Sequence, residues 1–128
     1  MNPPLLPDTD VLVDFLRGHA AAVALITSES ERIVLSAIVV AELYSGVKGD
    51  EEEAALGAFV SLFRLIPVNG TIAKTGGLYR RQYGKSHGVG LADAIIAATV
   101  AAENAELKTL NIRHYPMLHG LRPAYGKS

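Results

Sequence analysis

The chain alternates short apolar segments with longer amphipathic ones, and this alternation limits its fold more than any other feature. Strands are predicted at residues 5–6, 32–36, 64–69 and 105–111, where apolar residues cluster between turn residues. The segment LRPAY, residues 121–125, is predicted to form a last short edge strand, where proline is tolerated. Strands that alternate with helices pair in parallel and carry helices on both faces, so the sequence predicts an α/β fold.

Apolar residues at helical spacing predict the helices that connect these strands. The predicted helices run from about residue 9 to 17, 20 to 28, 37 to 47, 50 to 63, 71 to 86 and 91 to 102. Ser36 is suited to cap the third helix, and the acidic residues 50–53 suit the positive N-terminal end of the fourth. With 128 residues, 49% of them hydrophobic, the chain is predicted to form one domain, residues 1–128.

Composition excludes several kinds of site. The chain has no cysteine, so it has no disulfide and no thiolate metal ligand, and any metal must bind oxygen or imidazole. The longest apolar stretch, residues 91–102, contains Asp93 and is too short to cross a bilayer. The N-terminal segment lacks the basic start of a secretion signal. We therefore expect a cytoplasmic protein.

Charge is distributed unevenly, although the net charge is only −1. Residues 1–64 contain 4 basic and 10 acidic side chains, a net charge of −6, whereas residues 65–128 contain 8 basic and 3 acidic ones, a net charge of +5. The basic residues of the second half could meet a polyanion such as RNA or an acidic partner, or form an ordinary solvated surface with salt bridges. They gather at Lys74, Arg80, Arg81 and Lys85 and again at Lys108, Arg113 and Arg122.

Three carboxylates stand in apolar surroundings. Asp8 follows the first predicted strand, Glu42 lies in the middle of the helix predicted at 37–47, and Asp93 lies near the start of the last helix. The sequence places no lysine or arginine beside any of them. An unpaired buried carboxylate costs on the order of several kcal/mol or becomes protonated, so each of the three needs a partner.

Each acid also has a purely structural interpretation. Asp8 could cap the helix that follows it, Asp93 could cap or begin its own helix, and Glu42 could face solvent along an exposed edge. Asp10 and Asp14 share one helix face and are interpreted as a solvated stripe, although Asp10 could support a neighbouring site. His114 and His119 are interpreted as packing or surface residues rather than as acid–base groups.

If Asp8, Glu42 and Asp93 meet at the carboxyl ends of the strands, their like charges require a cation. Mg²⁺ and Mn²⁺ are commonly held by a few carboxylates together with waters and substrate phosphates. Such an ion activates water and neutralises charge on a phosphate. The three acids therefore favour metal-assisted hydrolysis of phosphodiester bonds.

Four segments together resemble the PIN-domain family, and in particular its VapC toxins of toxin–antitoxin pairs. LLPDTDVLVDFLRG is similar to the family's opening strand and turn, with the first acid at Asp8. LSAIVVAELYSGV is similar to the helix that bears the family glutamate at Glu42, and GLADAIIAATVAA to the helix that bears the third acid at Asp93. LKTLNIRHYPML resembles the closing motif, which places Thr109 and Asn111 at the end of the last strand.

The resemblance implies a three-layer α/β/α fold whose central, mainly parallel sheet has four or five strands. It further implies an Mg²⁺- or Mn²⁺-dependent endoribonuclease that acts as the toxin of a toxin–antitoxin pair. Asp8, Glu42 and Asp93 would bind the metal and orient the nucleophile, and Asn111 would assist by hydrogen bonding. Asn111 stands where many relatives carry a fourth acid, which predicts weak binding of a second ion.

The resemblance also implies a homodimer and a cognate antitoxin that holds the protein inactive. A dimer would account for apolar residues in excess of what two peripheral helices must bury. These positions are Val39, Leu43, Val60 and Phe63.

Other functions remain open at the level of sequence. DTDVL resembles the Asp-x-Asp start of haloacid-dehalogenase phosphatases, whose first Asp is a covalent nucleophile, but that family needs a later lysine and further acids. A receiver domain would need a phosphoacceptor Asp after its third strand, where RLIPVNG ends with Asn69. A PIN scaffold that only binds RNA or protein is the third alternative.

Overall fold

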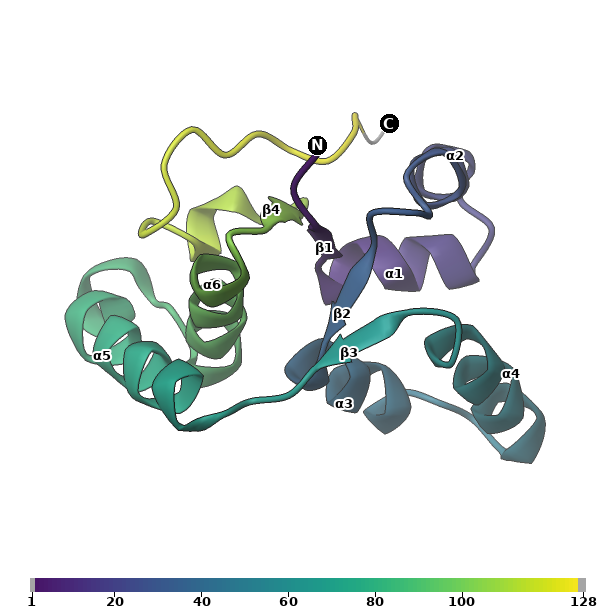
Figure 1. Cartoon of the computed structure of the whole chain (residues 1–128), viewed down its shortest axis with the longest axis horizontal. Helices are drawn as coiled ribbons and strands as arrows, with labels where there is room; N and C mark the ends of the chain where they lie inside the picture. The colour runs from purple at the N-terminus through teal and green to yellow at the C-terminus, as the bar shows by residue number, and fades with distance from the viewer. Residues whose placement is uncertain (1, 127–128) are drawn as a thin grey trace.

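Four short parallel strands lie within residues 2–126 and run through the middle of the molecule (Figure 1). They are β1 (Leu5–Pro7), β2 (Val34–Ser36), β3 (Arg64–Ile66) and β4 (Glu106–Lys108), in a computed structural model that describes residues 2–126. β1 pairs with β4 and β2 pairs with β3, and a parallel bridge between Leu5 and Ile33 connects the two pairs. The spatial order is therefore β4–β1–β2–β3, which confirms the predicted parallel sheet.

The edge strand predicted at residues 121–125 is wrong, because this segment adopts no strand. A single backbone hydrogen bond, from Ala124 N–H to the Thr109 carbonyl at 2.9 Å, is its link to the chain that leaves β4. Pro123 has no N–H group to donate, so a regular ladder cannot extend through it. Within residues 2–126 the sheet thus has four strands.

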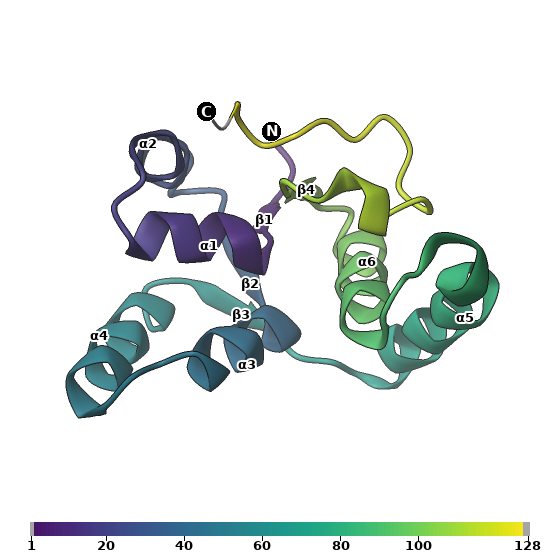
Figure 2. The same cartoon turned by 180° about the vertical axis from the view of Figure 1, so that it is seen from behind.

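Helices cover both faces of the sheet. In chain order they are α1 (Thr9–Leu16), α2 (Ala20–Ser28), α3 (Ala37–Ser45), α4 (Asp50–Val60), α5 (Gly70–His87) and α6 (Leu91–Glu103), followed by the 3-10 turn η1 (Ile112–His114). Figures 1 and 2 show α5 and α6 on one side of the strands and α1 to α4 on the other, which confirms the three-layer arrangement. Within residues 2–126 no single helix is long and apolar enough to cross a membrane, and α1 and α2 meet that test only as a pair bent by 108°.

The core lies between the two helical layers and the sheet. Leu5 and Leu6 of β1, Leu35 of β2 and Ile96 of α6 are all fully buried. Val39 and Leu43 of α3 belong to the same core, with exposures of 0% and 6%. The prediction that these two residues supply surplus apolar surface for a dimer is therefore wrong, because they pack within one chain. The other two positions of that prediction, Val60 and Phe63, are half-buried against the core.

Candidate active site at the carboxyl ends of the strands

Asp8 lies at the carboxyl end of β1, in the middle of the sheet. Its backbone N–H donates to the Lys108 carbonyl at 2.8 Å, which continues the pairing of β1 with β4. Its side chain is 5% exposed, and Oδ1 accepts the Thr9 N–H at 2.8 Å at the start of α1. Asp8 is therefore both a helix cap and a buried acid at the end of a strand, two roles that the sequence offers as alternatives.

Two hydroxyl groups donate to the other oxygen of Asp8. Thr109, just after β4, donates from Oγ1 to Asp8 Oδ2 at 2.8 Å, and the Tyr115 hydroxyl donates to the same oxygen at 2.8 Å. Both side chains are buried. These bonds hold the Asp8 carboxylate in one orientation from the opposite end of the chain.

The Tyr115 hydroxyl also contacts Asp93, in the first turn of α6. The distance to Asp93 Oδ1 is 3.3 Å. One hydroxyl thus bridges two carboxylates, and with contacts of 2.8 and 3.3 Å the two carboxylate oxygens lie within about 6 Å of each other. Burial, followed by the negative charges of Asp8 and Asp93, raises the pKa of Tyr115 well above its ordinary value, so the phenol keeps its proton.

Asp93 has a second partner in His114, at the end of η1. The His114 Nδ1 atom lies 3.0 Å from Asp93 Oδ2. Burial raises the pKa of the Asp93 carboxyl and the charge of Asp8 raises it further, while His114 and the Tyr115 hydroxyl oppose this shift. Asp93 is therefore a carboxylate whose negative charge is only partly compensated by the protein.

Glu42 joins this cluster through Thr9. The Thr9 hydroxyl donates to Glu42 Oε1 at 2.7 Å, while the Thr9 backbone N–H binds Asp8. Glu42 lies on α3, which begins immediately after β2, where the Ser36 hydroxyl accepts the Ile38 N–H at 3.1 Å. The neighbouring strand and its capped helix thus carry Glu42 to the same end of the sheet as Asp8.

The solvated stripe predicted for Asp10 and Asp14 is wrong. Asp14 is 6% exposed and accepts the Tyr125 hydroxyl at 2.6 Å. Asp10 is half-buried, and its carboxylate accepts the N–H groups of Val11 and Leu110 at 2.7 and 3.0 Å. The segments after β4 cover this face of α1, a contact that helix periodicity alone does not reveal.

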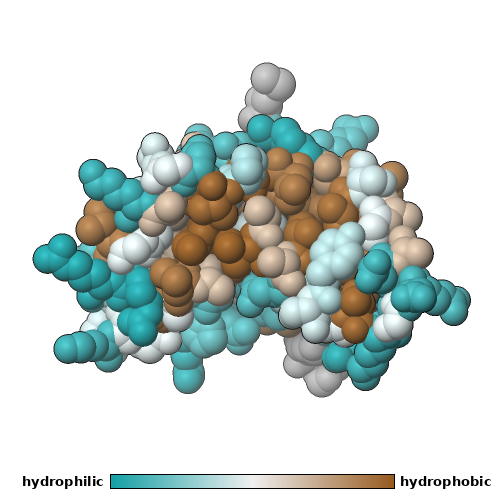
Figure 3. Space-filling view, turned by 90° about the horizontal axis from the view of Figure 1, so that it is seen from below, coloured by the Kyte–Doolittle hydropathy of each residue, from teal (hydrophilic) through white to brown (hydrophobic). Residues whose placement is uncertain are grey.

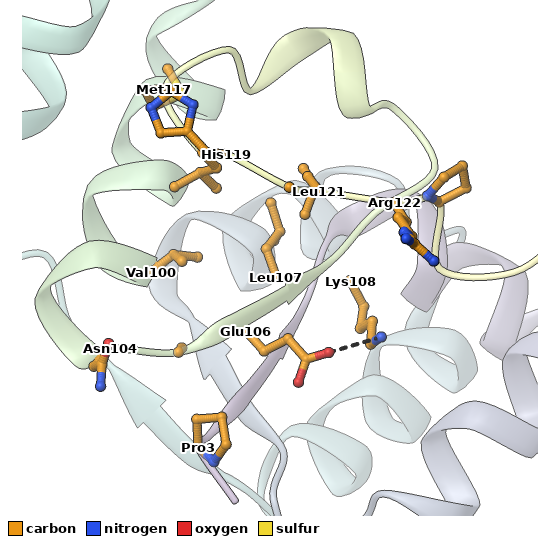
Figure 4. Close-up of a pocket in the computed structure, with 14 residues that line it drawn as sticks. Pro3, Val100, Asn104, Glu106, Leu107, Lys108, Met117, His119, Leu121 and Arg122 are labelled. Atoms are coloured by element: carbon orange, nitrogen blue, oxygen red, sulfur yellow. Dashed lines mark ion pairs between the residues drawn. The ribbon is translucent and has the colours of Figure 1, made fainter.

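Asn111 and His119 lie outside the hydrogen-bonded cluster of the three acids. Asn111 is exposed, and its backbone N–H donates to Thr109 Oγ1 at 3.0 Å, whereas its side chain forms no hydrogen bond within residues 2–126. His119 lines a separate open hollow of about 790 Å³ between β4, the end of α6 and residues 117–123 (Figure 4). None of the three acids lines that hollow.

The cluster suits a hard divalent cation in its chemistry. Asp8, Asp93 and Glu42 offer oxygen ligands at one end of the sheet, and no lysine or arginine within residues 2–126 forms an ion pair with them. No three His, Asp or Glu side chains in that part of the chain already lie in a geometry that could hold an ion. At Asp8 and Asp93 the Tyr115 hydroxyl lies between the two carboxylate oxygens, at 2.8 and 3.3 Å, whereas Mg²⁺–oxygen bonds are only about 2 Å long. The donor set therefore fits such an ion once these two carboxylates draw together.

Sequence reasoning missed three residues that make these contacts. Thr9, His114 and Tyr115 were not expected to connect the acids, and Tyr115 resembles an ordinary core aromatic residue because apolar residues, Pro116 to Leu118, follow it in the sequence. Its two partners are 107 and 22 residues away along the chain. The closing motif, which places Thr109 and Asn111 at the end of the last strand, pointed to this region without identifying these contacts.

A parallel sheet with clustered acids at its carboxyl ends, covered by helices on both faces, defines a class of α/β domains. The PIN domain family matches residues 5–115, and the chain belongs to this family.

Two relatives and one solved structure are similar over nearly the whole chain. Over 124 residues the chain is 42% identical to Ribonuclease VapC19 of Mycobacterium tuberculosis, which covers 94% of this chain and 98% of that protein. It is 36% identical to Ribonuclease VapC10 of the same organism, with coverage of 94% and 92%. A toxin–antitoxin complex from Klebsiella pneumoniae contains a chain with a TM-score of 0.81 and 26% identity, covering 94% of this chain and 98% of that one.

Proposed function

We propose that this protein is a divalent-metal-dependent endoribonuclease and the toxin of a VapBC-type toxin–antitoxin pair. The observation that carries the proposal is the connection of Asp8, Glu42 and Asp93 through the hydroxyl groups of Thr9 and Tyr115 at the carboxyl ends of the strands. The similarity to two proteins named ribonucleases supports RNA as the substrate.

Asp8, Glu42 and Asp93 would hold Mg²⁺ or Mn²⁺. When bound, the ion would supply charge neutralisation at the scissile phosphate and an activated water. Thr109 and the backbone of Thr9 fix the orientation of the Asp8 carboxylate, and His114 fixes that of Asp93. The exposed Asn111, two residues beyond Thr109, would contribute a hydrogen bond to the substrate.

A cleavage assay on labelled RNA tests the proposal. We expect cleavage by the wild-type protein in Mg²⁺ or Mn²⁺, its loss in a chelator, and a loss of at least about a hundredfold in Asp8→Asn, Glu42→Gln and Asp93→Asn. Glu51→Gln, an exposed acid in the first turn of α4, is the matched control and should cleave like the wild type. Cleavage that survives in all three site variants would exclude this site. RNA binding without any cleavage would favour the non-catalytic scaffold.

The partners of this protein are proposed from the same similarity. The neighbour from Klebsiella pneumoniae is described as a toxin–antitoxin complex, and we infer a cognate antitoxin here that places a basic side chain at the acidic cluster. We also infer a homodimer, because Leu62 and Leu65 around β3 are 73% and 46% exposed. Light scattering at micromolar concentration should give twice the monomer mass for the wild type and less for Leu62→Glu. A wild-type monomer would refute the dimer.

A further inference from the structure

The hydrogen bonds of the acidic cluster show which carboxylate oxygens are already engaged. A carboxylate offers about four acceptor positions, two on each oxygen. Asp8 Oδ2 uses both of its positions for the hydroxyl groups of Thr109 and Tyr115, and Asp8 Oδ1 uses one for the Thr9 N–H. Asp93 Oδ1 lies 3.3 Å from the Tyr115 hydroxyl, whose single proton it shares with Asp8, and Asp93 Oδ2 faces His114. Tyr115 is the one hydroxyl in this set that contacts both acids.

A cation that binds Asp8 Oδ2 and Asp93 Oδ1 together would take the position between them that the Tyr115 hydroxyl occupies. We propose that Tyr115 is a positioning residue that competes with a divalent cation for Asp8 Oδ2 and Asp93 Oδ1. This inference rests on the proposed function of the site. The proton of the phenol partly offsets the repulsion between the two acids, as a cation would, and the cation must displace it in order to bring the carboxylates together.

The ring and the hydroxyl group of Tyr115 make different contacts. The side chain is 1% exposed and its ring belongs to the core, so the aromatic ring is held whether or not the hydroxyl is present. The hydroxyl is the part that faces the acids, and phenylalanine retains the ring without that group. Replacement by phenylalanine therefore removes the competitor and leaves the packing.

Calorimetric titration with Mn²⁺ alone tests this inference on the full-length protein. We expect Tyr115→Phe to bind Mn²⁺ about tenfold more tightly than the wild type, because a hydrogen bond to a charged acceptor no longer has to be broken. The matched control is Tyr125→Phe, which removes a half-buried phenol hydroxyl bonded to Asp14, a residue outside the cluster, and should leave the affinity unchanged. Circular dichroism confirms that each variant is folded.

A second measurement separates competition from structural damage. In thermal unfolding in chelator, Tyr115→Phe should melt below the wild type. On addition of Mn²⁺ its melting temperature should rise by more than that of the wild type. A variant whose core is merely loosened would not show this larger rise. If Tyr115→Phe does not fold, 4-fluorophenylalanine at position 115 fills nearly the same volume without the donor and takes its place.

Each outcome has a defined meaning. Unchanged or weaker Mn²⁺ affinity in Tyr115→Phe overturns the proposed competition between Tyr115 and the cation. In that case the proposed nuclease function still stands if the wild-type protein binds Mn²⁺ and cleaves RNA. Absence of Mn²⁺ binding in both proteins overturns this inference and the metal dependence together, and the cleavage assay then decides separately whether the chain is a nuclease.

Discussion

Asp8 carries a structural and a proposed chemical role in one side chain. Its carboxylate caps α1 and accepts hydrogen bonds from two hydroxyl groups. The effect of a substitution at Asp8 therefore depends on which of these roles the substitution removes. We expect Asp8→Asn to abolish RNA cleavage while the melting temperature changes by only a few degrees, because asparagine is also a good helix cap and hydroxyl groups can rotate to donate or accept. Asp8→Ala should destabilise the protein by about 1–3 kcal/mol, since it removes the cap and leaves the hydroxyl groups unpaired.

Chemical denaturation and the cleavage assay on the same preparations check this prediction. If Asp8→Asn were as unstable as Asp8→Ala, the hydroxyl groups would need the charge of Asp8 and not merely an acceptor.

The raised pKa of Asp93 makes a prediction about pH. A carboxyl whose pKa is raised on folding binds its proton more tightly in the folded than in the unfolded protein. Its contribution to the free energy of unfolding is therefore greatest below the ordinary pKa of 3.8 and is lost as the pH rises through the raised pKa. In chelator, Asp93→Asn should therefore melt above the wild type near pH 7, and the difference should shrink as the pH falls toward 4. Thermal melts across this range check it, with the exposed Glu51→Gln as control. A difference that does not change with pH would mean that the charge of Asp93 is fully compensated.

At the scale of elements, the contact between α5 and α6 decides where Asp93 lies. α5 approaches α6 closely at Gly76, where a Cβ atom would lie 2.8 Å from Ile95 Cγ1 and 3.0 Å from Ile95 Cα. The second of these atoms is backbone and cannot rotate away. A side chain at position 76 must therefore push the helices apart and move the first turn of α6.

We expect Gly76→Ala to lower the free energy of unfolding by about 1–3 kcal/mol through overpacking. Gly77→Ala is the matched control, because it is the next residue of the same helix and its Cβ would meet nothing within 4 Å. It should be neutral or stabilise the protein by up to about 1 kcal/mol through helix propensity. Urea denaturation measures both, and equal stability of the two variants would refute the close contact.

At the scale of the whole molecule, the distribution of exposed basic residues indicates which surface could meet a polyanion. Figure 3 shows the face seen from below in Figure 1, with apolar surface near its middle and hydrophilic side chains around it. Four exposed basic residues extend along α5, which packs on the helix that carries Asp93, and none of them forms an ion pair within residues 2–126. They are Lys74, Arg80, Arg81 and Lys85. This arrangement favours the interpretation of the basic second half as a surface for a polyanion.

We expect Lys74→Gln in the first turns of α5 to weaken RNA binding and to lower the slope of log affinity against log salt by about 0.7, the value for one phosphate of a single strand. Arg17→Gln, at the far end of α1 from Asp8, removes one exposed charge and should leave the slope unchanged. Fluorescence anisotropy with a short RNA at several salt concentrations measures both variants. Equal slopes for Lys74→Gln and the wild type would exclude α5 from the RNA surface.

The sequence by itself determined the layout of the fold, because apolar periodicity and helix caps are local properties. Alternating segments predicted the parallel sheet and its two helical layers, and charges isolated in apolar segments identified Asp8, Glu42 and Asp93 as residues that need partners. The same local rules failed at residues 121–125, where a proline interrupts a segment with apolar residues.

Only the tertiary structure decided which partners those acids have. The hydroxyl of Tyr115 reaches Asp8 across 107 residues, and that of Tyr125 reaches Asp14 across 111. Nothing in the sequence around a tyrosine tells a core aromatic ring from one whose hydroxyl bridges two carboxylates. The distinction arises when the segment after β4 folds back over α1 and α6, because hydrogen bonds depend on distances of about 3 Å that only the packed chain sets.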